Sequence, residues 1–176
     1  MANKQALRDL QTRLAERMRQ VRNEQPGVSW LAVDCAGHGL LFALHQAGEI
    51  FKLEGLLPVP YTQPWLAGVV NLRGGVYTVV DLGIFLGLRD QGAQAPVLTA
   101  RLLAFNSALE VNSTLLVDRL EGLRHAADMQ AVPESDDNAA RPSFAAARWQ
   151  DAGGRVWQEV DLAELAKLPQ FLAISA

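Results

Sequence analysis

Residues 64–88, with the sequence PWLAGVVNLRGGVYTVVDLGIFLGL, constrain the fold of this chain more than any other stretch. Two runs rich in β-branched and aromatic residues flank Gly74 and Gly75, and such residues favour an extended backbone. A tight reversal needs backbone angles that glycine adopts at little cost. The stretch therefore predicts a strand, a turn at the two glycines with Arg73 carried to its tip, a second strand and a short helical turn. On pattern alone, this is a buried hairpin with an arginine at a solvated turn.

The same stretch resembles a known family. The run Asn-Leu-Arg-Gly at residues 71–74 follows PWLAGVV and precedes VVDL at residues 79–82, and this ordered pattern is similar to the signature of CheW-like domains. These are the adaptor proteins of bacterial chemosensory arrays. The resemblance extends more weakly over residues 29–172, and it is nearest to the subtype that serves type IV pilus systems.

The resemblance implies a mainly β fold of two packed SH3-like, five-stranded barrel subdomains. An N-terminal amphipathic helix (residues 1–26) would precede a CheW-like domain (residues 27–176) whose two barrels are interwoven. Strand-length apolar runs separated by glycine and proline between residues 28 and 154 point to the same class. We expect the chain to cross between the two lobes more than once, and we expect a short helix near the C-terminus.

The resemblance also implies a protein-binding site. A Glu-Ile pair at residues 49–50 occupies the family's position ahead of a strand that leads to the Asn-Leu-Arg-Gly turn. On pattern alone Glu49 is a polar residue near a turn. In the family the matching glutamate and arginine lie close together, so we hypothesise a hydrogen bond from Arg73 to Glu49. The implied protein-binding residues are Glu49, Ile50, Asn71, Leu72, Arg73 and Gly74.

The function implied by the resemblance is that of a non-catalytic adaptor. One surface would hold the regulatory domain of a CheA-type histidine kinase, and the groove between the barrels would hold the cytoplasmic tip of a chemoreceptor. The protein would be cytoplasmic, be recruited to membrane-associated receptor arrays, and control twitching by type IV pili. The alternative is a small all-β ligand-binding or hydrolase domain with an unrecognised active site.

Several functional classes are disfavoured by the residues themselves. No GxSxG or GxxxxGK[ST] motif and no Cys/His pair near a nucleophile is present, so we expect neither an enzyme nor a cofactor. The net charge of −3 and the pI near 5.6 argue against a nucleic-acid partner. No apolar run approaches the roughly 20 residues that span a bilayer, so we expect no membrane insertion.

Metal and disulfide sites are likewise not expected. His38, His45 and His125 lack the spacing of a zinc site, and the acidic residues of 128–137 lack the spacing of a calcium loop. Cys35 is the only cysteine, so no internal disulfide is possible. It lies in an apolar run, which predicts a buried small residue and not a nucleophile.

Residues 3–24 form a region with its own pattern. Five apolar side chains at helical spacing predict one apolar side of a helix, and residues 26–27 (Pro-Gly) end it. The six basic and three acidic residues of this segment give it a net charge of +3, whereas the remainder carries −6. The helix could pack on its own domain, bind a partner or lie on a membrane surface; the absence of Trp and Phe weakens the last option. The five residues of this stripe are Leu7, Leu10, Leu14, Met18 and Val21.

The remaining elements are predicted from periodicity and turn residues. Residues 126–147 have little pattern and predict a long, mobile surface loop. Asp161 is predicted to cap a short helix through residue 167, much like a capping box with Glu164, before Pro169 stops it. The predicted strands are residues 28–35, 40–44 (after a turn at 36–39 that includes His38), 97–105, 110–118 (interrupted by the polar run Asn-Ser-Thr) and 155–160.

Overall fold

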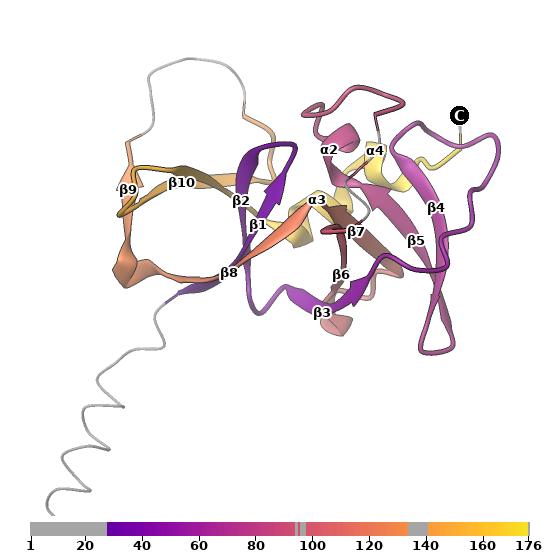
Figure 1. Ribbon diagram of the computed structural model, residues 1–176, viewed down its shortest axis with the longest axis horizontal. Helices are drawn as coiled ribbons and strands as arrows, with labels where there is room; N and C mark the ends of the chain where they lie inside the picture. Colours follow the sequence, from indigo (N-terminus) through magenta and orange to yellow (C-terminus); the bar gives the residue numbers. More distant parts are fainter. Residues whose placement is uncertain (1–27, 94, 96–97, 134–140, 176) are drawn as a thin grey trace, which may run out of the picture.

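The computed structural model describes residues 28–93, 95, 98–133 and 141–175 (Figure 1). The predicted amphipathic helix over residues 1–26 lies outside this part of the chain, and so does residue 97 of the strand predicted over residues 97–105.

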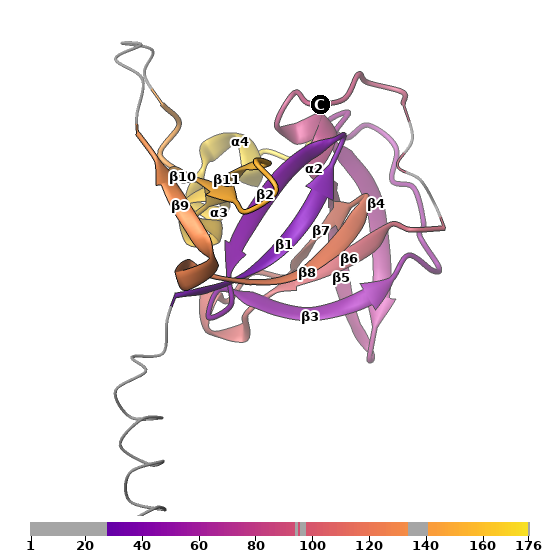
Figure 2. The same cartoon turned by 60° about the vertical axis from the view of Figure 1, so that its left-hand side comes forward.

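Two sheets make up the described molecule (Figures 1 and 2). The first has the strand order β8-β1-β2-β11-β10-β9, and the second has the order β3-β6-β7-β5-β4. The strands of the first are β1 (Ser29–Cys35), β2 (His38–Ala43), β8 (Arg119–His125), β9 (Met129–Val132), β10 (Ala145–Asp151) and β11 (Val156–Val160). Those of the second are β3 (Ala47–Lys52), β4 (Leu66–Leu72), β5 (Gly75–Asp81), β6 (Arg101–Phe105) and β7 (Ser113–Val117). The helices are short: α2 (Leu82–Phe85), α3 (Leu162–Lys167), α4 (Pro169–Leu172) and the 3-10 turns η1 (Ser107–Leu109) and η2 (Ala126–Asp128).

The predicted fold class is confirmed, with one difference in strand number. The chain is mainly β and forms two lobes, but the first sheet has six strands where five were expected. Strands β1 and β2 belong to the first sheet, β3 to β7 form the whole second sheet, and β8 to β11 belong to the first sheet again. The chain therefore crosses between the lobes twice, so no single cut would separate them.

Strand alternation divides the apolar residues between two kinds of core. In β1, Trp30 and Ala32 point into the core of the first lobe, where they meet Leu41, Met129 and Trp157. The intervening residues of β1 belong to a larger cluster shared by both sheets. Because side chains alternate across a strand, a strand that lies between two cores must be apolar on both faces.

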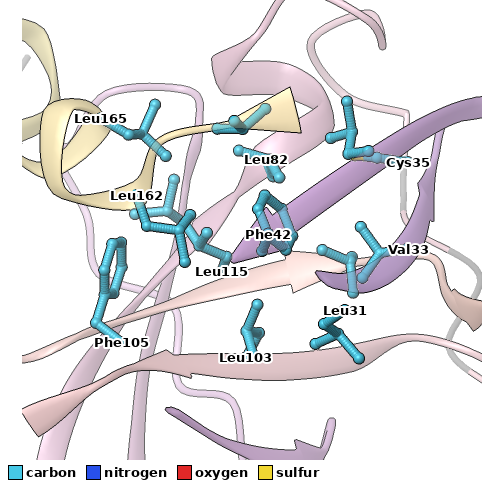
Figure 3. Packing of buried hydrophobic residues seen from close by; sticks show 14 of the residues in the cluster. Leu31, Val33, Cys35, Phe42, Leu82, Leu103, Phe105, Leu115, Leu162 and Leu165 are labelled. Carbon is cyan, nitrogen blue, oxygen red and sulfur yellow. The ribbon is translucent and has the colours of Figure 1, made fainter. Parts of the chain in front are cut away.

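The second lobe follows the same rule. Leu102 of β6 and Leu116 of β7 pack in its own core. Their neighbours Leu103 and Leu115 face the shared cluster, where they meet Phe42 and the two leucines of α3 (Figure 3). The shared cluster therefore joins the lobes, and Phe171 of α4 adds to it from the C-terminal end.

The C-terminal helical region agrees with the prediction. The Asp161 carboxylate accepts a hydrogen bond from the Glu164 N–H at 3.0 Å, which satisfies one of the free donors at the start of α3. Pro169 ends α3 and begins α4 directly.

The loop prediction for residues 126–147 was wrong for residues 126–132 and 145–147, whereas residues 133 and 141–144 lie outside helices and strands as predicted. Residues 126–128 form η2, β9 follows, and residues 145–147 begin β10. Met129 is buried against the aromatic residues of the first lobe, and β9 pairs with β10, with Val132 opposite Arg148. The strand forms because a partner strand and one buried side chain hold it, and neither feature is visible in the local pattern.

Three smaller boundaries also differ. The β1–β2 turn is only Ala36 and Gly37, both at positive φ, so His38 begins β2 instead of lying in the turn. Strand β6 begins at Arg101. Strand β7 begins within the polar run of residues 112–114, because the Thr114 hydroxyl donates to Thr78 O at 3.2 Å and so satisfies a polar group inside the sheet.

Candidate protein-binding site

The tip of the β4–β5 hairpin is a two-residue turn. Leu72 pairs with Gly75, so Arg73 and Gly74 form the turn and Gly75 belongs to β5, which corrects the predicted placement at the two glycines. Both turn residues have positive φ, 49° and 86° respectively, as a tight hairpin of this hand requires. The Asn71 side-chain oxygen accepts a hydrogen bond from the Gly74 N–H at 3.0 Å, which helps hold Arg73 in a conformation that is uncommon for a side chain of its size.

Glu49 reaches this turn from another edge of the same sheet. It lies within β3 and, as expected, precedes the strand that leads to the turn, which is β4. Strands β3 and β4 are the two outer strands of the second sheet, yet Arg73 Nη2 donates a hydrogen bond to Glu49 Oε1. The sheet must therefore curl until its edges meet, and the predicted hydrogen bond closes it on one side.

The pair and its surroundings face solvent. The side chains of Arg73 and Glu49 are 75% and 46% exposed. Beside them, Ile50 and Val76 are also exposed, although both are large and apolar. Of the six predicted residues, Glu49 and Ile50 lie on β3, Asn71 and Leu72 on β4, and Arg73 and Gly74 in the turn. Leu72 is half-buried and packs on the core of the second lobe. The structure thus forms the pair; its role in binding remains a prediction.

A second surface lies between the lobes. A cavity of about 540 Å³ is bounded by the β1–β2 turn, by β2 and β11, and by two leucines that follow α2. Its walls come from both lobes, because β2 and β11 belong to the first sheet while α2 follows the second sheet's β5. Its apolar lining includes Leu40, Leu86, Leu88, Phe144, Val156 and Val160.

Next to this cavity lies a buried ion network that the sequence interpretation did not anticipate. Arg89 Nη1 donates to Asp81 Oδ2 at 2.9 Å, and Arg89 Nη2 donates to Asp118 Oδ1. Asp118 also accepts a hydrogen bond from the Ala36 N–H at 2.8 Å, so it ties the β1–β2 turn to the end of β7. The sequence carried one indication of this network, because Asp81 and Asp118 each follow a valine at the end of an apolar strand.

The burial of this network shifts the protonation of nearby groups. Burial raises the pKa of Asp81, while hydrogen bonding from the Ile84 N–H and the charge of Arg89 act against the rise. Burial, together with the negative charge of Asp118, raises the pKa of the Cys35 thiol to about 12. Cys35 is fully buried, as predicted, and is a packing residue of the shared cluster.

The described residues contain no group of three or more His, Cys, Asp or Glu side chains arranged to hold a metal ion. In the same part of the chain, no helix has the length and apolar character needed to cross a membrane.

The two-lobed β fold and the Asn-Leu-Arg-Gly hairpin agree with the resemblance to CheW-like domains. The model of the CheW-like domain matches residues 29–170 of this sequence. The chain belongs to the CheW-like domain family.

Named relatives agree with this assignment. The chain is 27% identical to Protein PilI of Pseudomonas aeruginosa over 99 residues, which is 55% of this chain and 53% of that protein. It is 27% identical to Chemotaxis protein CheW of Thermotoga maritima over 101 residues, 57% of this chain and 63% of the relative. The matches thus span about half to three fifths of the length of these curated relatives.

A solved structure shows the same fold. The scaffolding protein TtCheW of Thermoanaerobacter tengcongensis superimposes with a TM-score of 0.65 over 81% of this chain and 90% of that chain. The sequence identity is 16%, so the likeness concerns the fold. It accords with the expectation of two SH3-like subdomains.

Proposed function

We propose that this protein is a non-catalytic adaptor of a bacterial chemosensory array. It holds a CheA-type histidine kinase through the kinase's regulatory domain, and it holds the cytoplasmic tip of a chemoreceptor. Membership of the CheW-like family supports this function, as do the names of its relatives, a chemotaxis protein and a scaffolding protein. The likeness to PilI supports an output through type IV pili and twitching motility, with the protein in the cytoplasm at membrane-associated arrays.

The observation that carries the proposal is the exposed Glu49–Arg73 pair. An ion pair this exposed contributes little to stability, typically about 1 kcal/mol or less. The position of Arg73 is nevertheless constrained. The turn holds Arg73 at positive φ, and the Asn71 side-chain oxygen stabilises the turn by accepting a hydrogen bond from the Gly74 N–H. Exposed Ile50 and Val76 beside it supply the apolar area that a protein partner would bury around a charged centre.

An adaptor needs two surfaces that can be occupied at once. The β1–β2 turn lies on the upper side of the molecule and the β4–β5 turn on the lower side in both views (Figures 1 and 2). The first turn carries Arg73, and the second borders the inter-lobe cavity. We assign the kinase regulatory domain to the Arg73 end and the receptor tip to the cavity. An amphipathic helix inserts apolar side chains into a groove of this kind.

Binding of a purified CheA-type regulatory domain to the immobilised full chain tests the assignment of the Arg73 end. Arg73→Ala should weaken kinase binding at least tenfold. Lys167→Ala is the matched control, since Lys167 and Glu164 form an ion pair of similar exposure, 70% and 41%, on α3. Equal effects of the two substitutions, or none from Arg73→Ala, would remove Arg73 from the binding surface.

Binding of a receptor-tip fragment tests the cavity in the same way. Val156, 46% exposed at the cavity, is the residue to change, and Val156→Asp should weaken receptor binding without affecting kinase binding. Leu172→Asp, at a 68% exposed leucine on α4, is the control. If Val156→Asp leaves receptor binding intact, the receptor binds elsewhere.

The alternative of a small hydrolase or ligand-binding domain is tested alongside. The chain is incubated with ATP and with generic ester substrates in the presence and absence of the kinase fragment. Binding of the kinase without turnover by the chain alone supports the adaptor. Turnover that persists through purification and is lost in a single-residue variant would favour the enzyme.

A further inference from the structure

The Arg89 side chain is buried, although an arginine is seldom removed from water without partners. It is 8% exposed and lies shortly after α2. The N–H groups of Leu88 and Arg89 both donate to Gly83 O, at 2.8 and 3.0 Å, so the chain after α2 folds back over that helix. A Cβ at Gly83 would lie 3.2 Å from Arg89 Cζ, so the guanidinium packs directly on the backbone of α2. The segment after α2 therefore directs Arg89 inward.

Asp118, which Arg89 binds, is the residue at which the chain passes from the second lobe back to the first. It stands between β7 of the second sheet and β8 of the first. Its Oδ2 accepts a hydrogen bond from the Ala36 N–H at 2.8 Å, and its own N–H donates to Asp34 O at 3.0 Å. Asp34 and Ala36 belong to β1 and to the β1–β2 turn. Asp118 is thus bonded to the first lobe, while Arg89 bonds it to Asp81 at the end of β5 in the second.

Two walls of the inter-lobe cavity begin one residue away from these bonds. Gly37, which lines the cavity, follows Ala36, and Leu88, which also lines it, precedes Arg89. The first wall belongs to the β1–β2 turn, and the second to the segment after α2. Hydrogen bonds that run from Ala36 through Asp118 to Arg89 connect the two walls. A change in the geometry of this connection would move one wall relative to the other.

The shared apolar cluster does not by itself fix the spacing of the two walls, because apolar burial is non-directional. Charge-assisted hydrogen bonds from a planar guanidinium are directional. A buried ion network is also weak evidence for stability, since well-packed apolar residues of similar volume often stabilise a fold equally well, although removal of one partner alone is costly. The network around Arg89 is therefore better explained by the positions that it imposes than by the stability that it adds.

We propose that Arg89 is a positioning residue for the inter-lobe cavity. By binding Asp81 and Asp118 at once, it sets the spacing between the β1–β2 turn and residues 86–88, and thereby the width of the groove that a helical partner meets. The identity of that partner, a receptor tip, rests on the proposed function. The spacing of the walls does not, because it depends only on contacts within this chain.

Selective loss of receptor binding is the first test. Arg89→Lys keeps the positive charge, but an ammonium cannot reproduce the planar contacts that a guanidinium makes with two carboxylates. We expect Arg89→Lys to weaken binding of a soluble receptor-tip hairpin about tenfold, and to leave binding of the kinase regulatory domain within about twofold. Asp118→Asn keeps an oxygen for the Ala36 N–H and removes the charge that Arg89 meets. It should have the same effect, and it replaces Arg89→Lys if that variant does not fold.

Gly68→Ala is the control for a general loss of stability. It strains β4, and Gly68 does not line the cavity. Urea unfolding is measured for every variant beside binding, and receptor binding by Gly68→Ala should stay within about twofold of the unchanged chain. Equal losses for Gly68→Ala and Arg89→Lys would overturn the proposal, because destabilisation would then explain both. So would receptor binding that Arg89→Lys leaves unchanged.

Amide hydrogen exchange tests the positioning without any partner. The N–H groups of Ala36 and Asp118 make the bonds between Asp118 and the β1–β2 end of the first lobe. Arg89→Lys should speed their exchange about tenfold beyond any change seen in Gly68→Ala, because local opening becomes easier there. Unchanged exchange at both amides would overturn the proposal. If the unchanged chain binds no receptor tip, the proposed receptor assignment fails, and the exchange result still decides whether Arg89 positions the walls.

Discussion

Glu49 lies on one edge strand of the five-stranded sheet and Arg73 lies in the turn that follows the other edge strand, yet Arg73 Nη2 donates a hydrogen bond to Glu49 Oε1. The pair exists only because the sheet curls until β3 approaches the tip of the β4–β5 hairpin. The hydrogen bond therefore depends on the curvature of the second sheet, and it lies at the end of the molecule that we propose binds the kinase.

Removing Arg73 should separate binding from stability. Arg73→Ala should change the free energy of unfolding by about 1 kcal/mol or less, because the pair is exposed. It should weaken partner binding by about 2–5 kcal/mol if the partner buries the pair. Arg73→Lys should restore only part of the binding, since an ammonium cannot make the planar contacts of a guanidinium. Urea unfolding and surface plasmon resonance measure the two effects.

A double-mutant cycle tests the pairing itself. Glu49→Ala and Arg73→Ala should each weaken kinase binding, and the double variant should lose less than the sum of the two. Binding energies that simply add would mean that the two side chains act independently in the complex.

Arg89 should matter more for stability than any exposed ion pair. Its side chain is 8% exposed and neutralises two carboxylates, Asp81 and Asp118. Arg89→Met leaves both buried carboxylates without a cationic partner and should lower the free energy of unfolding by about 3–5 kcal/mol. The triple variant with Asp81→Asn and Asp118→Asn should recover part of this loss. Urea denaturation measures both; a loss near zero for Arg89→Met would show that water solvates the carboxylates.

Gly68 should resist substitution because the chain passes close to it. A Cβ at this position would lie 2.3 Å from the carbonyl oxygen of Leu57, and Gly68 has a φ of +147°. Leu57 and Val69 exchange two backbone hydrogen bonds that cover the outer edge of β4. Gly68→Ala should therefore lower the free energy of unfolding by about 2 kcal/mol or more.

Gly87→Ala is the matched control for Gly68. Gly87 also has a positive φ, +69°, but a Cβ there would meet nothing within 4 Å. Gly87→Ala should lower the free energy of unfolding by about 1 kcal/mol, because it introduces backbone strain without a steric clash. Equal melting temperatures for the two variants would contradict the steric explanation.

The Cys35 thiol should be inert in the folded protein. Burial raises its pKa from its usual value of 9.0 to about 12. Because the folded state holds the proton more tightly, this group's contribution to stability is complete below pH 9 and is lost as the pH rises through 12. Cys35→Ala should therefore reduce the fall in stability between pH 9 and 11.

Thiol titration provides the direct measurement. At pH 8 a disulfide reagent should leave the native chain unmodified and should modify one thiol per chain after unfolding in urea. Rapid modification of the native chain would show that the β1–β2 end of the shared cluster opens readily.

Several elements of the fold could be predicted from the local sequence pattern. The β4–β5 hairpin, the β1–β2 hairpin and the α3 cap at Asp161 depend on backbone angles and side-chain alternation, which neighbouring residues determine. The Asn-Leu-Arg-Gly turn and its Glu49 partner were found through the family resemblance, because no local rule links residues so far apart in the chain.

The tertiary structure decided everything that depends on partners distant in sequence. Strand β9 forms because β10 lies beside it and Met129 finds a buried place, although its own residues carry little strand signal. The Arg89 network exists because the ends of β5 and β7 and the β1–β2 turn converge on one buried position. Local propensity acts over a few residues, whereas strand pairing, sheet curvature and charge burial depend on which distant segments the shared core brings together.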